Sequence, residues 1–157
     1  INTRLEKLKQ GDFDAIILAC AGLERMNFNA LINQIIPTSI MLPACGQGAI
    51  GIECRENDKH IQEIIAPLHC EETATCVAIE RTVNRLLGGH CHVPIAIFSK
   101  FLAKDTIELE ARVYDAKGLK KLLWKKSFGV LDALESAKAC ADDLLAQGAL
   151  ELIRHEP

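Results

Sequence analysis

The hydrophobic pattern of the C-terminal half constrains the fold more than any other feature of the chain. Residues 71–87 carry apolar side chains at helical spacing, and Gly88-Gly89 end this helix because glycine tolerates positive φ. Strand-like segments follow, separated by turn residues, at 93–101, 106–114 and 121–128. A second amphipathic helix is predicted at 132–147. These elements make a complete α+β unit with a three-stranded antiparallel sheet, so residues 71–157 are expected to fold as one domain.

The N-terminal third gives only part of an α/β pattern. A helix is predicted at 2–10, and the strand at 14–20 is apolar on both faces, as in a covered parallel sheet. Helical stretches at 21–26 and 29–36 follow, and one further strand is predicted at 50–54. A sheet needs several strands to be stable, so the missing ones are expected upstream or in another chain. The predicted fold class is α/β plus α+β, with the α/β segment incomplete.

Small residues mark a connection in the middle of the chain. Gly46 and Gly48 lie within residues 44–51, which we interpret as a hinge or tight turn before a short helix at 58–67. A phosphate-binding loop is the weaker interpretation, because Gly46-Gln47-Gly48 lacks the third glycine or the lysine of such loops.

Composition limits the classes of partner and compartment. The net charge of −3 and the 4% of aromatic residues argue against nucleic acid. The apolar runs are too short to cross a membrane, and a start at Ile1 without Met is interpreted as internal to a longer chain. Seven cysteines without framework spacing favour a reducing cytoplasm, where most should pack as small apolar groups.

One cysteine stands in a different context. Cys91 lies between His90 and His92, just after Gly88-Gly89, in the loop that joins the helix predicted at 71–87 to the first strand. A thiol on a loop is displayed rather than packed, and two protonated imidazoles beside it would favour the thiolate. These residues alone fit equally well with the alternative that Gly88-Gly89 only cap the helix and that Cys91 is an incidental loop thiol.

A metal site competes for the same residues. The possible ligands come from two segments of the chain: His69 and Cys70 from one, and His90, Cys91 and His92 from the other. Three consecutive residues cannot easily face one tetrahedral centre, and the chain has no Cys-x-x-Cys or His-x-x-x-His pair, so we disfavour zinc. A lysine cluster over residues 117–126 is interpreted as a solvated face.

Three arginines, Arg4, Arg25 and Arg81, lie at element boundaries or on a helix near the predicted junctions. A guanidinium can hold a carboxylate through two parallel hydrogen bonds. Surface ion pairing is the alternative that these residues alone favour.

Five motifs, in order and spacing, resemble the porphobilinogen deaminase family over nearly the whole chain. They are Asn2-Thr3-Arg4-Leu5; Asp14 to Ala19 with Ala21-Gly22-Leu23 and Arg25; Leu42-Pro43-Ala44 with Gly46 to Arg55; Glu72-Thr73-Ala74 with Glu80-Arg81; and Gly88-Gly89-x-Cys91-x-Val93-Pro94. The resemblance implies three domains, two like type-II periplasmic binding proteins and an α+β domain bearing the cofactor cysteine. Residues 1–43 would then belong to domain 2, 44–70 to the hinge and the segment returning to domain 1, and 71–157 to domain 3.

The resemblance also implies the chemistry. Cys91 would hold a dipyrromethane cofactor through a thioether, and the enzyme would be a transferase of tetrapyrrole (heme) biosynthesis. It would condense four porphobilinogen units into hydroxymethylbilane and release ammonia each time. Deaminated porphobilinogen is an electrophilic azafulvene, which a thiolate or a pyrrole carbon can capture.

Other site residues follow from the same resemblance. Arg4 and Arg25 match arginines that bind the acetate and propionate groups of substrate and oligopyrrole, Arg4 also those of the cofactor. Arg81 matches a substrate-binding arginine near the growing chain. Gly22 and Gln47 match backbone or cleft positions. His90 and His92 depart from the residues that the family often has there.

The expected partner of this chain is the N-terminal half of the same enzyme. In the family that half carries the catalytic carboxylate, so these 157 residues alone are expected to be inactive. The full-length protein is expected to be a monomer, whereas the fragment could pair or swap through open sheet edges. The alternatives are a non-catalytic binding module of the periplasmic type and a cysteine-rich metal or redox protein.

Overall fold

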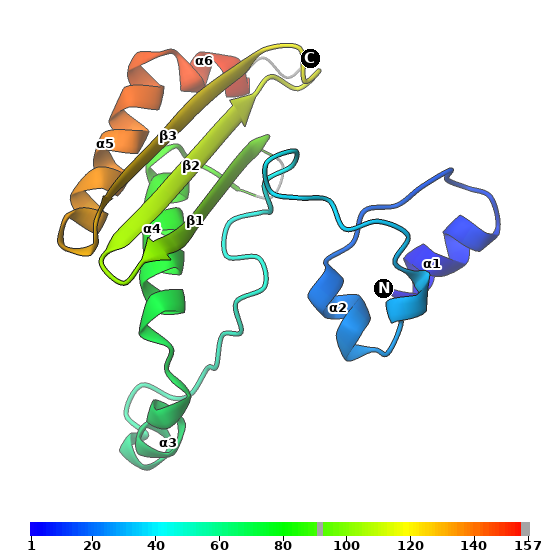
Figure 1. Ribbon diagram of the computed structural model, residues 1–157, viewed down its shortest axis with the longest axis horizontal. Helices are drawn as coiled ribbons and strands as arrows, with labels where there is room; N and C mark the ends of the chain where they lie inside the picture. Colours follow the sequence, from blue (N-terminus) through cyan, green and yellow to red (C-terminus); the bar gives the residue numbers. More distant parts are fainter. Residues whose placement is uncertain (91–92, 155–157) are drawn as a thin grey trace. The chain divides into compact units, whose positions relative to one another are not determined.

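The computed structural model describes residues 1–90 and 93–154. The chain divides into two compact units, residues 1–41 and residues 42–157, each of which is described by itself (Figure 1).

The first unit is helical. It contains α1 (Asn2–Lys9), α2 (Cys20–Arg25) and one 3₁₀ turn, η1 (Asn29–Leu31). The prediction of a strand at 14–20 is wrong, and the helix predicted at 29–36 is limited to η1. A strand needs hydrogen-bonded neighbours, and the described residues of this unit supply none. With no neighbouring strand or covering helix among those residues, Ile17 is 62% exposed.

The second unit begins with a long connection. Its helix α3 (Lys59–Ile65) starts at Asp58, whose side chain accepts a hydrogen bond from the Ile61 N–H, and the 3₁₀ turn η2 (Ala66–Leu68) follows. The strand predicted at 50–54 is also wrong. Ile50 and Ile52 are 75% and 52% exposed, for the same reason as in the first unit.

The remainder of the second unit is the predicted α+β domain. Helix α4 (Glu71–Leu86) precedes a three-stranded antiparallel sheet in the order β1-β2-β3. The strands and the elements that follow them are β1 (Ile95–Ala103), β2 (Thr106–Tyr114), β3 (Lys121–Gly129), η3 (Val130–Asp132), α5 (Ala133–Ala146) and α6 (Ala149–Arg154). Figure 1 shows α4 and α5 on one face of the sheet. Helix α6 was not predicted; it begins after Gly148, whose φ of +89° follows the end of α5.

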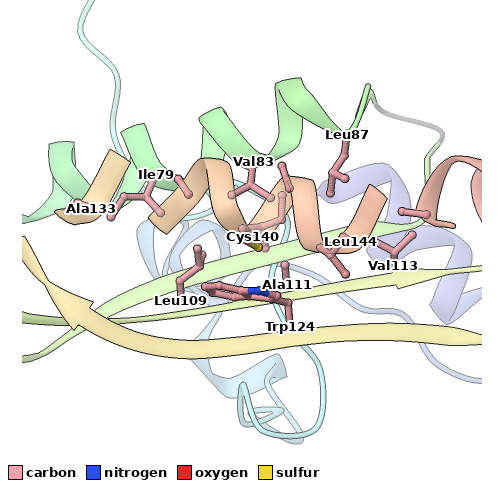
Figure 2. Packing of buried hydrophobic residues seen from close by; sticks show 14 of the residues in the cluster. Ile79, Val83, Leu87, Leu109, Ala111, Val113, Trp124, Ala133, Cys140 and Leu144 are labelled. Atoms are coloured by element: carbon pink, nitrogen blue, oxygen red, sulfur yellow. The ribbon is translucent and has the colours of Figure 1, made fainter. Parts of the chain in front are cut away.

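The core lies between the sheet and these helices (Figure 2). The central strand β2 alternates, with four fully buried side chains toward the helices: Ile107, Leu109, Ala111 and Val113. Helix α4 contributes Ile79 and Val83, and α5 contributes Ala137, Cys140 and Leu144. The Trp124 indole packs into this core, and its Nε1–H donates to the Asp143 carboxylate of α5 at 2.8 Å. The core therefore fixes α4, and with it the start of the Cys91 loop, against the sheet.

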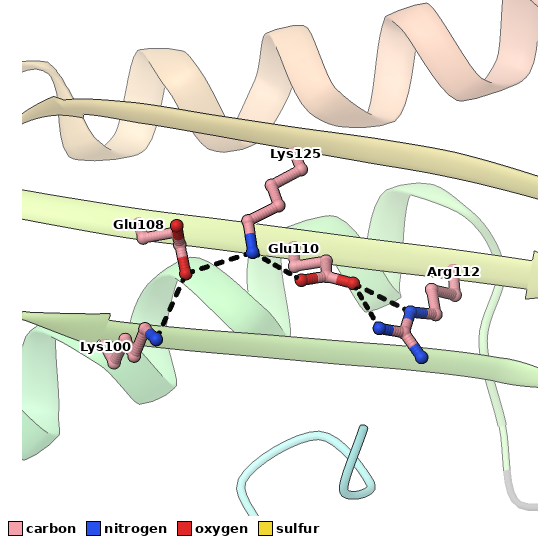
Figure 3. Close-up of polar contacts among 5 residues, drawn as sticks. All are labelled: Lys100, Glu108, Glu110, Arg112 and Lys125. Atoms are coloured by element: carbon pink, nitrogen blue, oxygen red, sulfur yellow. Dashed lines mark hydrogen bonds and ion pairs between the residues drawn. The ribbon is translucent and has the colours of Figure 1, made fainter. Parts of the chain in front are cut away.

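The opposite face of the sheet carries a ladder of charges across all three strands (Figure 3). Glu108 pairs with Lys100 at 3.2 Å and with Lys125 at 3.3 Å. Glu110 accepts from Lys125 Nζ at 3.0 Å and from Arg112 Nε at 2.7 Å. Glu110 and Arg112 side chains are only 10% and 11% exposed, so this pair is better shielded from water than ordinary surface ion pairs.

Acid should weaken the fold through Glu110. Its burial opposes ionisation, but the hydrogen bonds from Lys125 and Arg112 outweigh that effect and hold its pKa below the ordinary value. A carboxyl with a lowered folded pKa stabilises the fold above its unfolded pKa, about 4.3, and this stability is lost as the pH falls through the folded pKa. We expect the urea midpoint to drop on acidification from pH 5 to pH 3, and Glu110→Gln to flatten that dependence. Glu63→Gln, on exposed α3, is the matched control, and its urea midpoint should change with pH as the wild type's does. The same pH dependence in Glu110→Gln as in the wild type would contradict the role given to Glu110.

Candidate functional site

A groove of about 1260 Å³ runs along α4 in the second unit. One wall is α4 with the two glycines that follow it, and the other includes the loop around Cys45 and Gly46. Arg81 and Arg85 line the groove together with Gly88 and Gly89. The beginning of the loop that carries Cys91 therefore opens onto the same groove as two arginines.

The end of α4 explains how the chain enters that loop. Gly88 has a φ of +70°, and its N–H donates to the Arg85 carbonyl at 3.1 Å. The Gly89 N–H donates to the Asn84 carbonyl at 2.8 Å. This pair of bonds is the Schellman arrangement, which satisfies the last carbonyls of a helix and turns the chain away from its axis. The predicted helix end is confirmed, whereas Cys91 and His92 lie outside the described residues.

Glu80 holds the opposite wall in place. Its side chain, on a residue only 5% exposed, accepts from the Gly46 N–H at 2.7 Å and from the Ser99 N–H at 2.8 Å. The Ser99 hydroxyl lies 3.1 Å from the same carboxyl. One buried side chain thus joins α4, the loop around Gly46 (the glycine loop, residues 44–51) and β1. No role was predicted for Glu80 from the sequence. Its position three and seven residues before Val83 and Leu87 puts a charged residue on the buried face of the helix, which was a usable signal.

Arg81 and Arg85 give the groove its positive charge. Both side chains are exposed, and they lie four residues apart, on the same side of the helix. Within residues 1–90 and 93–154, neither guanidinium has a carboxylate at ion-pair distance. The groove can therefore receive anionic ligand groups. Arg85 was not predicted as a site residue, although its spacing of four residues from Arg81 could have indicated it.

The other predicted site residues lie elsewhere. Gln47 lines a smaller pocket of about 490 Å³ beside the groove, which shares Gly46 and Ala49 with it. Arg4, Gly22 and Arg25 belong to the first unit. Both arginines are exposed there, and a Cβ on Gly22 would lie 3.0 Å from Ile1 Cδ1, so the backbone packs closely at Gly22.

The described cysteines differ in their environments. Only Cys140 is buried, contrary to the expectation that most would be, and burial raises its pKa to about 12. Burial also raises the pKa of Cys45 and of Cys76. Cys70, at the start of α4, is exposed, and the hydrogen bond from the Thr73 hydroxyl lowers its pKa. Cys70 is therefore more thiolate-like than Cys45, Cys76 or Cys140.

Two absences in the described part of the chain concern metal binding and membrane insertion. Within the described part of the chain, no three His, Cys, Asp or Glu side chains are grouped so that they could hold a metal ion. Among the same residues, no helix combines the length and apolarity needed to span a bilayer.

Comparison with known proteins gives the family. Residues 1–63 match a family model described as porphobilinogen deaminase, dipyromethane cofactor binding domain, and residues 74–146 match porphobilinogen deaminase, C-terminal domain. A porphobilinogen deaminase of Legionella pneumophila (strain Lens) is 43% identical over all 157 residues, which cover 51% of that protein. The same enzyme of Dichelobacter nodosus is 46% identical over 156 residues, 99% of this chain and 50% of the relative. The chain thus spans about half the length of the curated relatives it matches. With both halves matched in order, it belongs to the porphobilinogen deaminase family.

Proposed function

We propose that this chain is the C-terminal part of a hydroxymethylbilane synthase, a transferase of tetrapyrrole biosynthesis. The full-length enzyme would condense four porphobilinogen units and release ammonia at each step, with Cys91 as the anchor of the primer. One observation carries the proposal: Gly88 and Gly89, from which the Cys91 loop starts, line the same groove as Arg81 and Arg85. Family membership does not favour the non-catalytic binding module.

The residues present fit a dipyrromethane cofactor. Its pyrroles carry acetate and propionate groups, and Arg81 and Arg85 offer guanidinium groups to carboxylates in a groove of ample volume, about 1260 Å³. When bound, the cofactor supplies a pyrrole carbon to which the first substrate is joined. The protein's part is to bind and orient: the arginines hold carboxylates, and Glu80 keeps the Gly46 loop against α4. Such positioning is a major source of rate in reactions between two bound partners.

The chain would form parts of three domains. In this proposal residues 1–43 belong to domain 2, 44–70 include the hinge and the return to domain 1, and 71–157 form domain 3. The exposed Ile17, Ile50 and Ile52 support it, because strands from the missing half would cover them. The two α/β domains would then be completed as sheets of the periplasmic-binding type. Without that half, the open edges could instead pair with a second copy, whereas the full-length protein would be a monomer.

The remaining site residues would contribute from the other domains. We assign Arg4 and Arg25 to binding of substrate and oligopyrrole carboxylates, with Arg4 also contacting the cofactor. Gly22 and Gln47 would shape the cleft through the close backbone packing and the pocket described above. The catalytic acid or base would come from the missing half, so the isolated chain would be inactive.

Peptide mapping of the full-length protein tests the anchor. Mass spectrometry should find the dipyrromethane mass on the peptide containing Cys91 and an unmodified peptide containing Cys70. Cys70 is the internal control, because its lowered pKa would make it a target of non-specific electrophiles. An unmodified Cys91 peptide in active enzyme would reject the assignment of the anchor. The 157-residue chain given porphobilinogen should form no hydroxymethylbilane. Turnover by this chain would refute the proposal that the catalytic acid or base comes from the missing half.

A further inference from the structure

Asn84 contacts the chain at the point where it leaves α4 for Cys91. We propose that Asn84 is a positioning residue, which sets the direction of the Cys91 loop and thereby the rate at which the anchor is loaded. This inference rests on the proposed function, since it assumes that Cys91 carries the cofactor.

Asn84 binds both polar groups of Gly89. Its backbone carbonyl accepts the Gly89 N–H at 2.8 Å, and its side-chain Nδ2 donates to the Gly89 carbonyl at 3.3 Å. The first bond is part of the helix end and does not depend on the side chain at 84. The second bond is an addition by the amide, and it fixes the plane of the peptide that follows Gly89.

Packing reinforces these hydrogen bonds. A Cβ placed on Gly89 would lie 2.0 Å from Asn84 Oδ1, 2.7 Å from its Cγ and 3.0 Å from its backbone oxygen. A Cβ placed on Gly88 would meet nothing within 4 Å, and glycine is favoured there by its φ of +70°. The two neighbouring glycines are thus required for different reasons. Gly89 is needed so that the backbone can lie against the Asn84 amide.

The contact is close enough to the anchor to matter. Cys91 follows Gly89 by only two residues in the sequence. Asn84 also lines the groove with Arg81 and Arg85, on the same turns of α4. Fixing the peptide after Gly89 limits the directions in which the thiol can be presented to a ligand held by those arginines. A small change of direction at such a site can lower a rate about 10²-fold.

The test measures loading of the cofactor in the full-length protein. Apo-protein is incubated with porphobilinogen, and intact mass follows the formation of the adduct over time. Asn84→Asp keeps the size but loses the donor, and Asn84→Ala loses both donor and packing. We expect loading to slow by about 10-fold or more in both variants, with kcat of the fully loaded enzyme changed much less.

Gln147→Ala is the matched control. The Gln147 amide also bonds to backbone at a helix end, with Nε2 donating to the Asp143 carbonyl at 3.1 Å at the end of α5, but it does not line the groove. It should load within about two-fold of the wild type. A second measurement, the thermal midpoint of Gly89→Ala with and without Asn84→Ala, should show that removing the amide relieves part of the defect.

Two results would overturn this inference while leaving the proposed function intact. One is a wild-type loading rate in both folded Asn84 variants. The other is a lowered thermal midpoint of Gly89→Ala that Asn84→Ala does not relieve. A wild-type protein without an adduct on Cys91 would overturn both.

Discussion

Replacing Cys91 with serine in the full-length protein should abolish the covalent adduct and reduce hydroxymethylbilane formation by roughly 10³-fold or more, because the acceptor is no longer held at high effective concentration. Serine keeps nearly the same size, but its hydroxyl is a far weaker nucleophile than a thiol near neutral pH. Turnover is measured from the oxidised product by absorbance, and the adduct by intact mass.

Cys54→Ser is the control for this experiment. Cys54 is a half-buried free cysteine that lines neither pocket, so the adduct and the turnover should be retained. If Cys91→Ser formed hydroxymethylbilane at the wild-type rate, Cys91 would not be the anchor, and the role given to its loop would be lost with it.

Replacing Glu80 with alanine should cause a large loss of stability in the second unit. Two N–H groups, that of buried Ser99 and that of half-buried Gly46, would lose their acceptor. Hydrogen bonds to a charged group contribute about 1.5–3 kcal/mol each, so we expect a loss of about 3 kcal/mol or more in the free energy of unfolding. Glu80→Gln should cost less, because its amide oxygen can still accept one of these bonds.

Urea unfolding of the 157-residue chain provides the measurement, since Trp124 is its only tryptophan and lies in the core of this domain. Glu72→Gln, exposed on the same helix, should cost less than about 1 kcal/mol. Hydrogen exchange at residues 44–50 should also quicken in Glu80→Ala, because the Gly46 amide is released. Equal stabilities of Glu80→Ala and Glu72→Gln would show that Glu80 does not hold the glycine loop.

The structure confirmed the elements whose partners are close in sequence. The three strands form a meander, so each pairs with the next one along the chain, and the turn residues at 104–105 and 115–118 predicted both connections. Helices α4 and α5 followed from apolar spacing, and Gly88-Gly89 marked the end of α4. Local pattern was sufficient there, because the domain buries its own hydrophobic face.

The site was predicted only in part. Arg81 and the glycines before Cys91 were identified, and the structure places them on one groove. Three residues were missed as functional candidates: Glu80, Asn84 and Arg85. Each acts through a contact or a groove position that the sequence pattern does not show. The acceptor role of Glu80, for example, exists only because Gly46 and Ser99 are brought to it from 34 and 19 residues away.

The sequence by itself determined the helices and strands of the α+β domain and the helix end from which the Cys91 loop starts, since each of these elements depends on a pattern of residues close to one another in the chain. It also predicted strands at 14–20 and 50–54, and only the tertiary structure decided that these stay unpaired in this chain. A strand is stable only when other strands satisfy its backbone and cover its faces, and the pattern of one segment does not say whether those partners are present. The joining of Glu80 to the glycine loop was likewise decided by folding, because it depends on contacts between distant segments.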